Sequence, residues 1–189
     1  MPEKKFKNEF KIPPPHFYRI GPNGRVPGWY GDTAVKIVES KEGKLTPAEK
    51  RVVQEEGYVA GPYWDTKKIV TTGVGQTGKW MKKTFKESFK HHEDITRGLT
   101  KDYDTLPDYL KSELIQSVYR GDWTKSKNTR GLFNQGNIRM SAEEFLDHEE
   151  YLDPRTPQHI KNRIRSVSDA LIRYADEIDG VAPGGDSGS

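Results

Sequence analysis

The stretch "TPAEKRVVQEEGYVAGPYWDTKKIVTTGVGQ", residues 46–76, carries the strongest structural signals in this chain. Thr46 is a typical helix N-cap, and Pro47 suits the first helical position. Glu49 lies three residues after Thr46 and completes a capping box. The pattern therefore predicts a short helix over about residues 47–56.

Gly57 follows this helix and is a natural C-terminal stop. Residues 58–75 then combine aromatic side chains, a turn at "DTKK" and the β-branched run "IVTT". These features are typical of a small hairpin or three-stranded sheet. The order is therefore a helix followed at once by a small β element.

From Lys79 onward the apolar pattern is helical, with repeats at three or four residues. Ser141 and Glu144 form another capping box, which predicts a helix that begins at Ser141. We expect an α+β domain over residues 45–180 that is mostly helical. The apolar faces consist of Met81, Phe85 and Phe89, then Leu106, Leu110, Leu114 and Val118, and finally Ile160, Ile164, Val167, Leu171, Ala175 and Ile178.

Residues 1–44 differ in composition, because proline, glycine and aromatic residues alternate in "IPPPHFYRIGPNGRVPGWYGD". We interpret them as an N-terminal arm that either packs on the main domain or docks onto a partner. The run Val35–Val38 favours a short strand. At the other end, residues 181–189 are expected to be a disordered tail because of their small polar composition.

The composition excludes several classes of function. The 189 residues include 31 lysines and arginines against 28 acids, and a net charge of +3 is too small to predict nucleic-acid binding. The chain has no cysteine, which excludes disulfides and thiolate metal sites. No apolar run approaches the roughly 20 residues of a membrane span, and no secretory signal is recognisable at the N-terminus.

The glycines of "TTGVGQTGKW" have the spacing G-x-G-x-x-G, which also occurs in dinucleotide-binding loops. That fold needs a second buried parallel strand after the helix, but "KHHEDITRGLTKDYDTLPDY" is polar and rich in turns. A Walker loop is also excluded, since Trp80 follows Lys79 where Ser or Thr is required. The adjacent histidines of "KHHED" are poorly spaced for one metal ion on a helix. We therefore expect no cofactor and no metal.

Two carboxylates lie upstream of this glycine loop, and a hydroxyl lies at its first residue. Glu56 ends the predicted helix, Asp65 lies in the β turn, and Thr71 lies on the following strand. A helix end that leads into a hairpin can bring all three to one cleft. Hydrolysis of a glycosidic bond needs two carboxyls, one protonated and one ionised.

Residues 52–76, "VVQEEGYVAGPYWDTKKIVTTGVGQ", resemble the active-site segment of the phage-type lysozymes, glycoside hydrolase family 24. The family spacing E-x8-D-x5-T is kept without an insertion. The resemblance implies that Glu56 is the general acid, Asp65 the second carboxylate and Thr71 the group that positions water. It also implies inversion, with the carboxyls about 6.5–9.5 Å apart.

The resemblance continues more weakly over about residues 50–175. It implies that Arg163 pairs with the catalytic glutamate and that Arg120 lies at the cleft. Gln76 stands where the family usually has histidine, so we expect the structural pairing of that imidazole to be lost. Gly73 is expected to let a sugar approach the backbone, as is Gly75, and Asn134 to line the groove. Trp64 and Trp80 fit either core residues or sugar platforms.

The resemblance implies a muramidase that cuts the β-1,4 bond between N-acetylmuramic acid and N-acetylglucosamine in bacterial peptidoglycan. The rival hypothesis is a virion structural or docking protein on a lysozyme-like scaffold, motivated by the arm of residues 1–44. The expected partners are peptidoglycan strands and, through the arm, phage virion or tail proteins. We expect the protein in a phage particle, or in the host cytoplasm with delivery to the cell wall.

Overall fold

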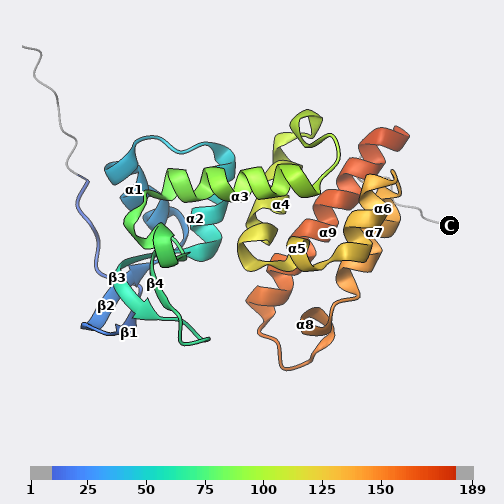
Figure 1. The fold of residues 1–189 in the computed structure, drawn as a ribbon. Coiled ribbons are helices and arrows are strands. Elements are labelled where there is room, and N and C mark those ends of the chain that lie inside the picture. The colour runs from blue at the N-terminus through green and yellow to red at the C-terminus, as the bar shows by residue number, and fades with distance from the viewer. Residues whose placement is uncertain (1–9, 182–189) are drawn as a thin grey trace, which may run out of the picture. The chain divides into compact units, whose positions relative to one another are not determined.

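The structure is a computed structural model that describes residues 10–181 (Figure 1). These residues form two compact units. The first unit comprises the described residues up to Thr46 together with Val53–Ser88, and the second comprises Pro47–Val52 and the described residues from Phe89 onward. Residues 182–189 of the predicted tail, and residues 1–9 of the predicted arm, lie outside the described range.

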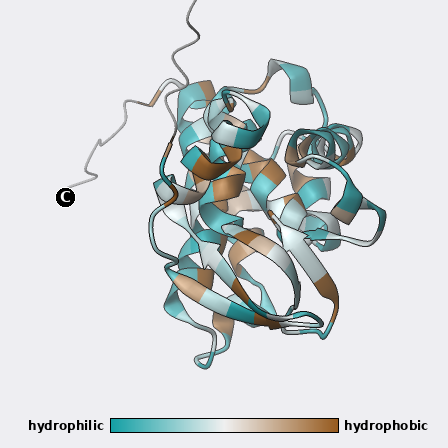
Figure 2. Cartoon of the chain, turned by 90° about the vertical axis from the view of Figure 1, so that its left-hand side faces the viewer, coloured by the Kyte–Doolittle hydropathy of each residue, from teal (hydrophilic) through white to brown (hydrophobic). Residues whose placement is uncertain are grey.

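The first unit contains one antiparallel sheet of five strands in the order β1-β2-β3-β4-β5. Figure 2 looks at this part of the chain and shows hydrophobic and hydrophilic segments in turn along curved strands. The elements are β1 (Phe17–Gly21), β2 (Gly24–Trp29), α1 (Gly31–Glu42), β3 (Tyr58–Trp64), β4 (Val70–Gly73), β5 (Gln76–Thr77) and the 3-10 helix η1 (Gly78–Lys82).

Two strands of this sheet come from the predicted arm. β1 and β2 form a hairpin, and β2 pairs with β3 through Gly28 with Val59 and Trp29 with Tyr58. The Trp29 side chain is buried and its indole N–H donates to the Pro13 carbonyl at 3.0 Å. Residues 17–29 of the predicted arm are therefore built into the sheet.

The predicted strand at Val35–Val38 is wrong, because these residues lie in helix α1. Ala34, Val35, Ile37 and Val38 are all buried. Their spacing of three and four residues places them on one helical face, and burial of that face overrides the β preference of valine and isoleucine.

The predicted helix at 47–56 is confirmed as α2 (Pro47–Glu56). It ends at Gly57, whose φ of 73° lies in the left-handed region that favours glycine. A Cβ on Gly57 would also stand 2.9 Å from the Trp29 carbonyl oxygen. The helix therefore stops at a residue that the local backbone requires to be glycine.

The second unit is helical. Its largest buried side chains include Trp123, Phe145, Leu114 and Leu171. The predicted helix start at Ser141 is wrong, because Ser141 is buried inside α7 and its hydroxyl donates to the Ile138 carbonyl at 2.6 Å. The remaining elements are α3 (Phe85–Leu99), η2 (Tyr103–Thr105), α4 (Asp108–Arg120), α5 (Asp122–Lys125), α6 (Lys127–Asn134), α7 (Ile138–Leu146), α8 (Glu149–Leu152) and α9 (Gln158–Asp179).

Residues 10–181 are mostly helical and contain one small antiparallel sheet, whose third strand follows α2 in the chain, and this confirms the predicted α+β class. Among residues 10–181, none of the helices combines the length and the apolar character that crossing a bilayer requires.

Candidate active site

Glu56 is the last residue of α2, directly before Gly57 and β3. A carboxylate at a helix C-terminus faces the negative end of the helix dipole, which disfavours it by about 0.3–1 kcal/mol. Helix stability therefore does not explain an acid at this position. The carboxyl reaches the turn between β4 and β5, where its Oε2 lies 3.1 Å from the position of a Cβ on Gly75.

Gly75 is required for two reasons. Its φ of 62° lies in the left-handed region, where a side chain costs energy. A side chain there would also press on the Glu56 carboxyl. Gly73 has a φ of 60°, and a Cβ on it would stand 2.6 Å from the Gln76 side-chain oxygen. Both glycines thus shape the turn on which the Glu56 carboxyl rests.

Asp65 follows β3 and is fixed by the turn that leads to β4. Its Oδ1 accepts hydrogen bonds from the amides of Lys67 at 2.8 Å and Ile69 at 2.9 Å. The turn contains Lys68 in the left-handed conformation, with φ 61°. An aspartate that bonds amides ahead of it in a turn is a common structural device. These two hydrogen bonds therefore fix the position of the Asp65 carboxylate, and through them its Oδ1 also stabilises the turn.

Thr71 lies on β4, directly opposite Tyr63 of β3, and only 3% of its surface is exposed. Its hydroxyl donates to the Ile69 carbonyl at 3.2 Å. A hydroxyl has one proton to donate, so the remaining capacity of Thr71 is as an acceptor. It can accept a hydrogen bond from a water molecule.

Tyr63 joins these residues electrostatically, and the sequence interpretation did not include it. Burial raises the pKa of the Tyr63 phenol, Arg19 lowers it, and the negative charges of Glu56 and Asp65 raise it. The phenol is thus within electrostatic reach of both carboxyls. Tyr63 lies two residues before Asp65, the spacing that places strand residues on one face, and this signal could have identified it.

Gln76 is buried and bonded to the backbone around it. Its amide nitrogen donates to the carbonyls of Trp80 at 2.9 Å and Lys83 at 2.7 Å, and its oxygen accepts from the Val74 amide at 3.3 Å. The Gln76 side chain therefore ties β5 to the backbone of the preceding turn and of η1. Trp64 is 48% exposed and is not a core residue.

Three further predicted site residues belong to the second unit, and their roles at the site stay predictions. Arg163 on α9 is buried, and its Nε donates to the Gln116 side-chain oxygen on α4 at 2.5 Å. Asn134 at the end of α6 accepts from the Lys101 amide at 2.9 Å and donates to the Leu99 carbonyl at 3.3 Å. Asn134 therefore joins α6 to the turn after α3.

Arg120 takes part in a cluster of charges. Its Nε donates to Asp122 at 2.8 Å, and its Nη2 bonds Glu150. The Nε2 of His148 lies 3.8 Å from Asp122. One side-chain atom each of Asp122, His148 and Glu150 lies within 4.8 Å of the other two, which is close enough for a metal site. Because Arg120 already compensates both carboxylates, the cluster is an internal ion network that joins α4, α5 and α8.

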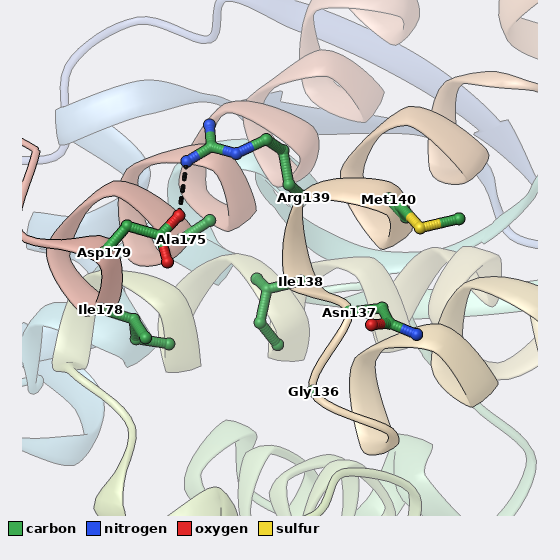
Figure 3. A pocket seen from close by; sticks show the side chains of 8 residues that line it. All are labelled: Gly136, Asn137, Ile138, Arg139, Met140, Ala175, Ile178 and Asp179. Carbon is green, nitrogen blue, oxygen red and sulfur yellow. Dashed lines mark hydrogen bonds and ion pairs between the residues drawn. The ribbon is translucent and has the colours of Figure 1, made fainter.

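The second unit also has a shallow cavity of about 200 Å³ between α7 and α9 (Figure 3). Ile138 and Ile178 line it, and its only charged residues are Arg139 and Asp179, which pair at 3.0 Å. A neighbouring cavity of about 280 Å³ shares both isoleucines. Neither has the pair of acids that hydrolysis needs, so the acids of the first unit form the better candidate site.

A helix that ends in an acid and leads into a small antiparallel sheet, followed by a helical unit, defines a lysozyme-like fold. The crystal structure of the active form of P1 phage endolysin Lyz is similar, with a TM-score of 0.54 over 76% of this chain and 94% of that chain. The two sequences are 12% identical, so the likeness shows the fold. No protein-family model matches the chain, and no curated protein matches it.

Proposed function

We propose that this protein is a peptidoglycan hydrolase of the muramidase type, which cleaves the β-1,4 bond between N-acetylmuramic acid and N-acetylglucosamine. The observation that carries the proposal is the grouping around Tyr63. Its phenol lies within the electrostatic reach of Glu56 and Asp65, and Thr71 is directly opposite it in the sheet. The fold shared with a phage endolysin supports the same class of activity.

In the proposed reaction, protonated Glu56 donates its proton to the glycosidic oxygen as the bond from that oxygen to the anomeric carbon breaks. A water molecule attacks the anomeric carbon from the opposite face and gives a proton to Asp65. Solvent then returns the proton from Asp65 to Glu56. The products are an alcohol and a new reducing end, so atoms and charge balance.

Thr71 is proposed to position the attacking water. Because its own proton is donated to the Ile69 carbonyl, Thr71 accepts a hydrogen bond from the water. The second proton of the water then points to the Asp65 carboxylate, which leaves a lone pair for the anomeric carbon. A water between acid and sugar belongs to an inverting route, so the proposal extends to inversion, as in glycoside hydrolase family 24.

Glu56→Gln tests the proposal, and Glu55→Gln is the matched control because it removes the same charge one residue earlier. Without a general acid, we expect clearing of a peptidoglycan suspension to slow about 10²- to 10⁴-fold. The control should stay within about twofold of wild type, and both variants should melt at similar temperatures. Clearing by Glu56→Gln at the wild-type rate would contradict the assignment.

A second role, docking onto phage virion or tail proteins, is favoured by the outer face of the β1–β2 hairpin. Tyr18 is 47% exposed and Ile20 is 64% exposed on this face. Deleting residues 1–44 would remove two strands and α1, so a surface variant is the better test. Tyr18→Ser with Ile20→Asn should keep peptidoglycan clearing while incorporation into particles is lost. Normal incorporation of this variant would contradict docking through the hairpin.

A further inference from the structure

The β1–β2 hairpin folds back over β3, on which Tyr63 lies. A Cβ on Gly21, at the end of β1, would stand 2.0 Å from the Pro62 carbonyl oxygen and 2.9 Å from the Tyr63 Cα. A Cβ on Gly61 would stand 2.8 Å from the side chain of Val26 on β2. The two glycines thus permit a contact that a larger residue would block, and β1 reaches the strand that leads to Asp65.

Alternation along β1 assigns its side chains to two faces. Gly21 faces β3, so Arg19, two residues earlier, projects from the same face. The Arg19 guanidinium lies 4.6 Å from the centre of the Phe17 ring, which is also on this face. Arg25 lies on the opposite face, 3.8 Å over the ring of Tyr18.

Arg19 therefore brings a positive charge to the part of the sheet around Tyr63. Its charge acts on the Tyr63 phenol, on which the charges of Glu56 and Asp65 also act. Among residues 10–181, the Arg19 guanidinium has no ion pair with an acid within 4.0 Å, and stacking on Phe17 orients it. A guanidinium that is exposed, oriented and not bonded to an acid presents its N–H donors to a carboxylate outside the protein.

We propose that Arg19 binds a carboxylate of the substrate beside the cleavage site, and so selects glycan strands that carry acidic substituents over neutral ones. This inference rests on the proposed function and names the substrate class of the same site. In peptidoglycan the carboxylate belongs either to the peptide stem or, where the stem is absent, to the lactyl group of muramic acid. A chitin oligosaccharide has the same β-1,4 linkage without an acid.

The test compares Arg19→Gln with Arg25→Gln, which removes the same charge from the other face of the hairpin, and with Arg19→Lys. On soluble peptidoglycan fragments, Arg19→Gln should raise KM about tenfold while kcat stays within about twofold, since one charge-assisted pair is lost. Arg19→Lys should recover part of the loss, and Arg25→Gln should match wild type. Equal losses for Arg19→Gln and Arg25→Gln would overturn the proposal.

Binding measurements in the Glu56→Gln background separate this inference from the proposed function, because they need no turnover. Titration calorimetry should detect weaker binding of Arg19→Gln to peptide-bearing fragments and no change with chitin oligosaccharides. A loss that persists with peptide-stripped strands assigns the contact to the lactyl carboxylate, and a loss confined to peptide-bearing strands assigns it to the stem. Equal weakening with the neutral oligosaccharide would overturn carboxylate recognition, whereas wild-type protein that cleaves no glycan would overturn the proposed function alone.

Discussion

Asp65 and Asp122 are both held firmly, but by groups of different charge. Asp122 is 6% exposed, and its carboxylate pairs with the Arg120 guanidinium at 2.8 Å. Asp65 is half-buried and is held by the neutral amides of Lys67 and Ile69. No ion pair to Asp65 within 4.0 Å occurs among residues 10–181.

The difference separates a structural acid from an acid that can take part in a reaction. A buried carboxylate next to a guanidinium is stabilised as an anion, and its charge is already compensated. A carboxylate positioned by amides keeps its place without a cation. Asp65 can therefore accept a proton without breaking an ion pair, whereas Asp122 cannot. The following variants test this contrast, from the largest expected effect to the smallest.

Asp65→Asn should remove activity and leave stability nearly unchanged. The asparagine oxygen can still accept the hydrogen bonds from Lys67 and Ile69, so the turn is preserved, but the amide cannot accept a proton from water. We expect peptidoglycan clearing to slow at least about 10²-fold, in line with the loss of a general base. Thermal melting checks the fold, and a large fall in melting temperature with clearing retained would reverse the roles given to the two aspartates.

Asp122→Asn should have the opposite effect. The variant leaves Arg120 in a largely buried site with only Glu150 as its acidic partner, and breaking a buried pair costs about 3 kcal/mol. Urea denaturation should detect that loss, while the specific activity of the folded fraction stays near that of wild type. Unchanged stability together with lost clearing would contradict a structural role for the cluster.

Gly75→Ala should lower the activity more than the free-energy cost of its left-handed backbone conformation accounts for. An L-residue in the left-handed region costs about 1–2 kcal/mol, and the added methyl also presses on the Glu56 carboxyl. Gly78→Ala is the matched control, because Gly78 has a φ of 54° and no atom within 4 Å of its Cβ position. Both variants should lose similar stability, but only Gly75→Ala should lose activity, about tenfold. Equal activities would show that the Glu56 carboxyl does not depend on this contact.

Tyr63→Phe should have the smallest effect, which appears only in alkali. Burial raises the pKa of Tyr63 above its ordinary value of 10.0, so above about pH 10 the unfolded chain loses this proton while the folded chain keeps it. Ionisation of Tyr63 therefore leaves the stability unchanged below about pH 10, and the stability falls as pH rises toward the folded-state pKa. Denaturation curves near pH 11 should show a smaller fall for Tyr63→Phe than for wild type, and an identical fall would contradict burial of the phenol.

Much of the candidate site could be predicted because its signals are local. The sequence signals at Thr46, Gly57 and Asp65 involve only neighbouring residues, and α2 and the β3–β4 hairpin form where these signals place them. The roles of Glu56, Asp65 and Thr71 stay proposals, since residue types describe which chemistry is available rather than whether it occurs.

The features that were missed depend on contacts between distant residues. Helix α1 forms at Val35–Val38 because its apolar face is buried, and a β-branched run alone does not report that burial. Gly21 and Gly61 permit the hairpin to close on β3, and no local sequence signal reports that contact. Arg19 became a candidate only through this closure.

The most direct test of the account is the analysis of the ends that wild-type protein produces from purified peptidoglycan. Mass spectrometry after borohydride reduction should find reduced N-acetylmuramic acid at the new ends, and early NMR spectra should show the α-anomer, as inversion requires. Reduced N-acetylglucosamine would contradict the proposed bond. Anhydro ends would contradict attack by a water molecule held by Asp65 and Thr71.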